Sequence, residues 1–469
     1  MKTTALLALL AALASLSPLV SAQTAMPREV NEERIAAAFA DARAALAEHL
    51  KVEVDAKFAP RLVSSKDVAA RVAEENLPIF RLRQPDAELA KAEAEQAGAA
   101  FGQSALAKYT WTTRELLVSA KTWRRQAVQL GRPELTSDET LRAVLVHELV
   151  HALDDARHDI GKLLGGMTTV DACLGFTGVL EGHAQLVARR VCELRGWSKG
   201  FETLTANIGG LPAGAEAMDP SQLEVLRAQG AINAAPYVAG ERFMAAVEAR
   251  GAEFVARAFQ SPPDNPDLLY HPDWYLDPKT RPQPKFALDA AIDVFAAPRS
   301  QDEWQVLRMT PPEAQLESSL LRLPPERARE ALRGRVASRT IVLQPRADLN
   351  SKLLSAVVHE FADEAALGRF VAAGTELSAL RDDDMRKAER VVRLKELTTR
   401  SIDAAAHKGR IDRRSLANGT FEFVATLALL ARGPVYIELV FSNEAIEDDA
   451  LLALADRMFD AAKPAITTR

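Results

Sequence analysis

LRAVLVHELVHALDD, residues 141–155, decides the fold, because it is expected to form one buried helix and it contains the pattern H-E-x-x-H. Residues four apart on an α-helix lie about 40° apart around the axis and about 6 Å along it, so His147 and His151 can reach one ion. Glu148 points about 100° away from His147, where it can take a proton from a metal-bound water. This arrangement is typical of a zinc hydrolase, so the expected cofactor is Zn²⁺.

The residues around the motif favour a metal site. Thr136 to Glu139 has the capping-box pattern T-x-x-E, so we expect the helix to start there. Much of the rest of the helix surface is apolar, and polar side chains inside a buried helix need a compensating partner. The apolar residues are Leu141, Leu145, Val146, Leu149, Val150, Ala152 and Leu153. The alternative is that the two histidines and the glutamate are core residues satisfied by hydrogen bonds.

A third ligand must come from another element. His158 lies on the same helical face but about 16 Å from His147 along the axis, too far to share an ion. The next amphipathic run, residues 176–194, places Glu181 at the edge of its apolar stripe, with His183 as a rival on the other flank. A carboxylate beside an apolar stripe is harder to explain without a cation than a histidine is. We therefore predict a catalytic ligand set with an open fourth position, formed by His147, His151 and Glu181.

A glutamate on a second helix after H-E-x-x-H resembles the gluzincins, the thermolysin-like metallopeptidases. More narrowly, four segments look like a group of bacterial and archaeal zinc peptidases with HEL-x-HALQDQ, EG-x-A, PY-x-x-G-x-x-F and HP-x-x-Y motifs. The segments are HELVHALDD (147–155), VLEGHAQ (179–185), PYVAGERF (236–243) and PPDNPDLLYHPDWYL (262–276). The match covers about residues 105–280, and it departs at Asp154 and His183, where the group usually has Gln and an acid.

The resemblance implies roles for further residues. A metallopeptidase needs a donor for the oxyanion, and the shared motifs contain two candidates, His271 and Tyr237. Alternatively, His271 and the proline after it only cap a rigid loop. Asp155 is a candidate for orienting one of the zinc histidines.

The first 22 residues, MKTTALLALLAALASLSPLVSA, have the pattern of a cleavable secretory signal peptide. We expect cleavage near Ala22/Gln23 and a periplasmic or secreted mature protein. The apolar run is too short for a spanning helix, and no cysteine near the cleavage point would carry a lipid, so no membrane anchor is expected.

The net charge indicates which kinds of partner to expect, and the cysteine positions indicate whether a disulfide can form. The net charge of −6 contains no basic block, so neither nucleic acid nor an anionic membrane is an expected partner. The expected partner is a peptide or protein substrate, and the sequence leaves the oligomeric state open. Cys192 lies about 22 Å from the start of the predicted helix at Thr177, and the chain back to Cys173 spans at most about 14 Å. Unless Gly182 breaks the helix, the two cannot pair, so we expect two free, buried thiols.

The predicted fold class is α+β, in two domains after the signal peptide. Residues 23–295 are expected to form a mainly helical, zincin-like catalytic domain with helices at 31–50 and 87–100. Residues 108–119 break the helical pattern and predict a β-hairpin, which either covers the core or binds an extended peptide backbone along its edge. An alternative for the N-terminal helices, within residues 27–101, is an inhibitory pro-segment.

Residues 296–469 are expected to form an α+β accessory domain. The predicted strands are 340–343, 353–361, 421–430 and 435–441, and the predicted helices are 363–373, 384–407 and 446–462. His359 and Glu360 imitate the start of the zinc motif, but Asp363 stands where the second histidine would be. We therefore expect His359 to be structural.

Together these features predict an exported zinc metallopeptidase in which Glu148 is the general base. Two alternatives remain open. One is a secreted binding or scaffold protein whose zinc site is structural and closed. The other is a zinc amidase that acts on cell-wall cross-links.

Overall fold

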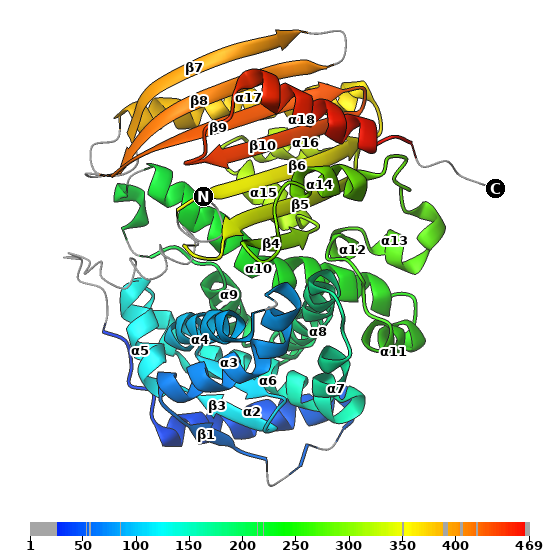
Figure 1. Ribbon diagram of the computed structural model, residues 1–469. Helices are drawn as coiled ribbons and strands as arrows, with labels where there is room; N and C mark the ends of the chain where they lie inside the picture. The colour runs from blue at the N-terminus through cyan, green and yellow to red at the C-terminus, as the bar shows by residue number, and fades with distance from the viewer. Residues whose placement is uncertain are drawn as a thin grey trace. The chain divides into compact units, whose positions relative to one another are not determined.

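The computed structural model describes residues 26–464, except 53, 56–57, 85, 213, 219, 349–350, 388–392, 404–406 and 419–420. The predicted signal peptide and its cleavage point lie outside the described residues. The fold is α+β, as predicted: a mainly helical region is followed by a region built on a large sheet (Figure 1).

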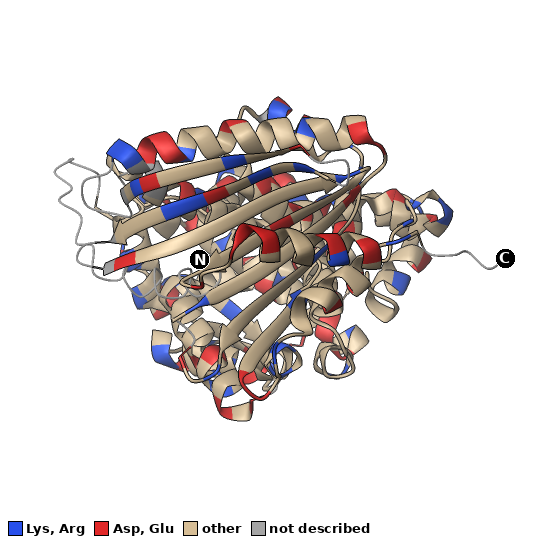
Figure 2. Ribbon diagram, turned by 45° about the horizontal axis from the view of Figure 1, so that its top comes forward, with Lys and Arg blue, Asp and Glu red and all other residues tan. Residues whose placement is uncertain are grey.

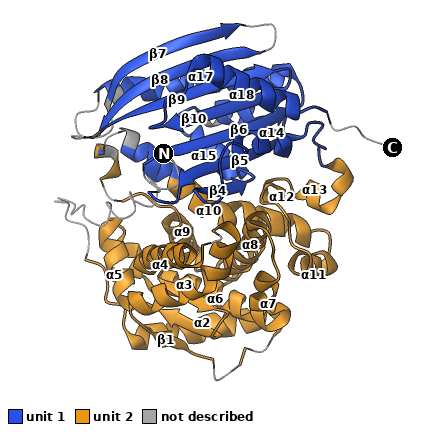
Figure 3. Ribbon diagram, viewed as in Figure 1, with its two compact units in different colours: residues 1–15, 218–228, 281–469 blue, residues 16–217, 229–280 orange. Residues whose placement is uncertain are grey.

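The chain forms two compact units (Figure 3). The helical unit comprises the described part of Leu16–Ala217 together with Gln229–Thr280. The sheet unit comprises Met218–Ala228 and the described part of Arg281–Arg469. Helix α10, Pro220–Glu248, therefore begins in the sheet unit and continues in the helical unit.

The division after Thr280 lies upstream of the predicted boundary between residues 295 and 296. The reason is α14, Leu288–Ala296, whose buried side chains Ile292 and Phe295 pack in the same hydrophobic cluster as the strands of the large sheet. An amphipathic helix next to a boundary does not reveal by its sequence which core it will join.

Two long helices form the centre of the helical unit, α6 (Asp138–His158) and α8 (Val170–Arg195). They share one hydrophobic cluster with α2 (Glu32–Leu50), to which α2 contributes Phe39 and Leu46. The other helices of this unit are α3 (Ser65–Arg83), α4 (Ala87–Ser104), α5 (Ala120–Gln129), α7 (Ile160–Gly165), α9 (Ser198–Asn207), α11 (Ala252–Gln260), α12 (Asp267–Tyr270) and α13 (Pro272–Leu276).

Helix α6 begins slightly later than predicted. Ser137 is its N-cap, because its side chain accepts a hydrogen bond from the Thr140 backbone N–H, whereas Thr136 ends a short 3₁₀ turn. Serine and threonine cap helices about equally well, so the sequence TS at this point did not distinguish them.

The predicted β-hairpin is present. Strands β2 (Ala107–Thr110) and β3 (Glu115–Val118) pair antiparallel, and β1 (Pro60–Leu62) adds to β3 in parallel, which was not predicted. The strand order is β1-β3-β2, so β2 lies at one edge of this small sheet. Helix α3 is tied to β2 through Lys108, whose ammonium lies 3.8 Å from the carboxylate of the buried Glu75.

The sheet unit contains a seven-stranded antiparallel sheet in the order β4-β5-β6-β10-β9-β8-β7. Its strands are β4 (Trp304–Met309), β5 (Arg335–Pro345), β6 (Leu353–Phe361), β7 (Arg393–Asp403), β8 (Lys408–Asn418), β9 (Phe421–Arg432) and β10 (Val435–Ser442). Helices α14 and α18 (Asp448–Ala461) share the main apolar cluster of the sheet. Smaller apolar clusters contain residues of α17 (Glu364–Lys387), and α15 (Glu313–Ser319) and α16 (Pro325–Leu332) complete the unit.

The predicted helix over residues 384–407 is wrong. Helix α17 ends at Lys387, and β7 and β8 follow it. Strand β7 lies at the edge of the sheet, and most of its side chains are exposed. Charged residues are therefore tolerated on both of its faces, and its sequence does not show the apolar–polar alternation of a typical strand. Figure 2 shows basic and acidic residues close together along this sheet. Arg410 pairs with Asp412 on β8, and Arg414 of β8 pairs with Asp382 of α17.

None of the helices in the described part of the chain is both long enough and apolar enough to cross a membrane.

Lowering the pH from about 6.5 towards 3 is expected to destabilise the sheet unit through His359, which is 2 % exposed on β6. Burial and the charge of Arg335 lower the pKa of His359 to about 3. Between the two pKa values the unfolded chain binds the proton more readily, so stability falls as pH falls, by at most about 1.4 kcal/mol per pH unit. Urea unfolding at several pH values should show a flatter pH dependence for His359→Asn than for the wild type. Equal slopes would contradict this assignment.

Both cysteines are free and buried, as predicted. Burial raises the pKa of Cys173, and burial together with neighbouring glutamates raises the pKa of Cys192 to about 12. A thiolate is the reactive form, so we expect a thiol reagent to label neither cysteine in the folded protein and both after denaturation. Rapid labelling of the native protein would show that α8, which carries both cysteines, opens locally.

Candidate metal centre

Helices α6 and α8 bring together the three predicted ligands. His147 Nε2 lies 3.1 Å from His151 Nε2 and 3.1 Å from Glu181 Oε2, and the distance from His151 Nε2 to the same carboxylate oxygen is 3.3 Å. Within the part of the chain that the structure describes, no other three His, Cys, Asp or Glu side chains come this close together. The cluster could therefore hold a metal ion.

The spacing of the three donor atoms fits tetrahedral coordination. With metal–ligand bonds of about 2.0–2.1 Å, neighbouring ligand atoms of a tetrahedron lie about 3.3–3.4 Å apart. The observed separations of 3.1–3.3 Å are close to this value. The histidine side chains are 7 % and 8 % exposed and that of Glu181 is 18 % exposed. The cluster is therefore mostly buried, but part of the Glu181 side chain is accessible to solvent.

The electrostatics of the cluster also favour a cation. Burial raises the pKa of Glu181, but the two histidines outweigh burial and hold this pKa well below its usual range. Burial lowers the pKa of His151, yet the charge and hydrogen bond of Glu181 leave it raised overall. The cluster therefore favours a positive charge beside the Glu181 carboxylate, which a metal ion can supply.

Glu148 is held beside the cluster by the small sheet. The backbone N–H of Tyr109 on β2 donates to Glu148 Oε2 over 2.6 Å, and Glu148 is 8 % exposed. In the antiparallel hairpin, Ser119 N–H donates to the Leu106 carbonyl, so alternation along β2 turns the Tyr109 N–H away from β3. The edge strand thus fixes one carboxylate oxygen of Glu148. The sequence did not predict this contact, since hydropathy patterns do not indicate which backbone N–H a side chain will reach.

Tyr237 on α10 also reaches the cluster. Its ring stacks on His147 with centroids 5.9 Å apart. Burial and the charges of Glu181 and Glu148 raise the pKa of Tyr237 well above its usual value, so the hydroxyl remains a donor.

Glycines allow α10 to approach α8 this closely. A Cβ at Gly182 would lie 2.1 Å from the Gly240 carbonyl carbon, and a Cβ at Gly240 would lie 2.1 Å from the Gly178 carbonyl oxygen. The two backbones are therefore in direct contact one turn from Tyr237. The glycine of the PY-x-x-G segment is Gly240, and this contact between α8 and α10 explains why a glycine stands there.

The other sequence candidates lie outside the cluster. The rival ligand His183 points its Nδ1 at Asp154 Oδ2, 2.7 Å away. His271 stacks on Trp274 with centroids 3.8 Å apart and is not one of the three clustered ligands. His158 stacks on Phe259 of α11.

Asp155 does not have the predicted role of orienting a zinc histidine. Its carboxylate accepts hydrogen bonds from the Tyr109 hydroxyl (2.8 Å) and the Ile160 backbone N–H (2.9 Å), and it lies 3.4 Å from Arg114 Nε. Position 155 lies about 80° around the helix from His147, on the side that contacts Tyr109 of the hairpin. Asp155 therefore anchors the strand that holds Glu148.

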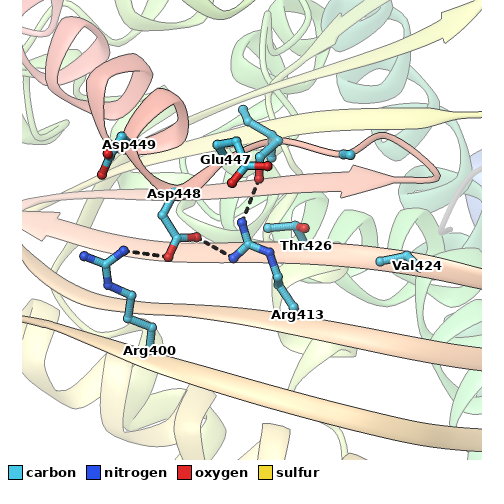
Figure 4. A pocket seen from close by; sticks show the side chains of 9 residues that line it. Arg400, Arg413, Val424, Thr426, Glu447, Asp448 and Asp449 are labelled. Atoms are coloured by element: carbon cyan, nitrogen blue, oxygen red, sulfur yellow. Dashed lines mark hydrogen bonds and ion pairs between the residues drawn. The ribbon is translucent and has the colours of Figure 1, made fainter.

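A cavity of about 450 Å³ lies in the sheet unit, away from these residues in sequence (Figure 4). Asp448 accepts hydrogen bonds from both Arg400 and Arg413, and Arg413 also donates to the Ile446 carbonyl. These hydrogen bonds lower the pKa of Asp448. The cavity is lined by Glu447, Asp448 and Asp449 but by no histidine or cysteine. Among the described residues, its side chains form no cluster that could hold a metal ion.

Comparison of the chain with protein-family models and with curated proteins finds no match.

Proposed function

We propose that this chain is an exported, zinc-dependent metallopeptidase of the gluzincin type. The observation that carries the proposal is the convergence of His147, His151 and Glu181 with Glu148 fixed beside them. The signal-peptide pattern of residues 1–22 supports export.

Zinc is the metal that these donors favour. Two imidazole nitrogens and one carboxylate oxygen form a three-ligand set, which in catalytic zinc sites leaves the fourth position to water. A site with only oxygen donors would favour magnesium or calcium instead. The exposed fraction of Glu181 supports an open fourth position over the closed shell of a structural zinc site.

In the proposed reaction, zinc supplies a Lewis acid that polarises the scissile carbonyl and acidifies water. Glu148, with one oxygen held by the Tyr109 N–H, takes a proton from the attacking water and passes it to the leaving amine. The Tyr237 hydroxyl, whose ring stacks on His147, donates to the developing oxyanion. The edge of β2, apart from the Tyr109 N–H that Glu148 occupies, offers a strand along which an extended substrate binds.

The test is removal and return of the metal. Purified protein is stripped with a chelator, reloaded with zinc, and assayed on casein, a set of short peptides and peptidoglycan. We expect stripped protein to be inactive and reloaded protein to cleave casein or peptides. Hydrolysis of peptidoglycan alone would support the amidase alternative. Tight zinc binding without hydrolysis of any substrate would favour the scaffold alternative and overturn the proposal.

A further inference from the structure

A second contact between α6 and α8 lies close to the metal ligands. His183 Nδ1 and Asp154 Oδ2 are 2.7 Å apart, and their side chains are 15 % and 2 % exposed. Positions 181 and 183 are about 200° apart around a helix, so Glu181 and His183 leave α8 on opposite flanks. Asp154 follows His151 by three residues and therefore continues the ligand stripe of α6. The same face of α6 is thus contacted from both flanks of α8.

The surroundings leave this pair little freedom. Phe259 of α11 meets the His183 ring edge-on, with centroids 5.5 Å apart, and stacks on His158 at 4.3 Å with an interplanar angle of 7°. On the side of α10, the backbone contact at Gly182 holds α8 directly against α10. The hydrogen bond from His183 to Asp154 therefore links the two ligand-bearing helices, α8 and α6, at a defined position.

We propose that Asp154 and His183 are positioning residues for the metal. Their hydrogen bond sets the register of α8 on α6, and so keeps the Glu181 carboxylate within coordinating reach of both histidine rings. A tetrahedral site tolerates displacements of only about 0.2 Å in its bond lengths, so a small shift of α8 weakens binding. This inference rests on the metal centre of the proposed function.

The test compares variants that differ only in the hydrogen bond. His183→Leu removes the donor but keeps the volume, whereas His183→Asn places an amide N–H near the position of Nδ1. Zinc dissociation constants are measured by competition with a chromophoric chelator, well below the unfolding temperature of each variant. We expect His183→Leu to bind zinc about 10–100-fold more weakly and His183→Asn to stay within about threefold of the wild type. The absorption spectrum of the Co²⁺-loaded proteins should change for the leucine variant only.

A matched control lies on the same helix. Gln185 Nε2 donates to Thr205 Oγ1 over 2.9 Å, which ties α8 to α9 and not to α6. Thr205→Val is expected to lower the unfolding temperature and to leave zinc affinity unchanged. A purely structural role for His183 would make His183→Leu behave like this control.

Equal zinc affinity of His183→Leu and wild type, or equal losses in the leucine and asparagine variants, would overturn the inference while leaving the proposed function intact. If His183→Leu does not fold, His183→Gln replaces it, because its amide lies near the far ring nitrogen and not near Nδ1. The inference then requires weaker zinc binding by His183→Gln than by His183→Asn, and equality would overturn it. A wild-type protein without zinc affinity would overturn the metal centre itself.

Discussion

Glu148→Gln is expected to lower the rate of peptide hydrolysis by about 10²–10⁴-fold, while the purified protein keeps its zinc. The amide has nearly the same shape as the carboxylate, and its oxygen can still accept the hydrogen bond from the Tyr109 N–H. It cannot take the proton from water, so the loss should fall on kcat and leave metal content unchanged. Casein hydrolysis and metal analysis on the same preparation measure both quantities.

Glu139→Gln provides the matched control, because Glu139 lies on the same helix two turns before the ligands. Its activity should equal that of the wild type. Full activity of Glu148→Gln would remove Glu148 from the mechanism and with it the proposed enzyme. Loss of zinc from Glu148→Gln would instead indicate that Glu148 supports the ligands.

Glu181→Ala is expected to lose zinc at concentrations that saturate the wild type. Only two imidazole ligands remain, and removal of a direct ligand should cost more than the about 10–100-fold typical of outer-shell substitutions. Zinc should raise the unfolding temperature of the wild type, because it binds the folded state, and should fail to do so for Glu181→Ala. Metal analysis after dialysis and thermal unfolding with and without zinc measure the effect.

Glu193→Ala is the control on the same helix, since Glu193 is exposed near the C-terminal end of α8. It should bind zinc as tightly as the wild type. Undiminished zinc stabilisation of Glu181→Ala would mean that the ion is held elsewhere, and the cluster would no longer be the metal centre.

The three ligands could be predicted because each depends on a local pattern. The spacing of His147 and His151 is fixed by the helix itself, and Glu181 stood out as a carboxylate beside an apolar stripe. The β-hairpin was predictable for a similar reason, since a break in helical period with aromatic and β-branched residues marks it.

The remaining parts of the site depend on contacts between distant segments. The Tyr109 N–H reaches Glu148 across 39 positions, and the Asp154–His183 bond spans 29. Neither pair shows any periodicity, and Asp155 was assigned to the histidines because its true partner, the hydroxyl of Tyr109, was not apparent. The error at β7 has another origin, because an exposed edge strand lacks the one-sided apolar pattern that identifies a strand.

The backbone contact between α8 and α10 at Gly182 and Gly240 limits which residues near the site can be changed. A methyl group at Gly182 or Gly240 would overlap the facing backbone, so neither position admits even alanine without separating the two helices. Substitutions meant to change substrate preference therefore belong on the turn after β2, where Thr112 is exposed, and not on β2 itself, where Ala107, Tyr109 and Thr110 are buried.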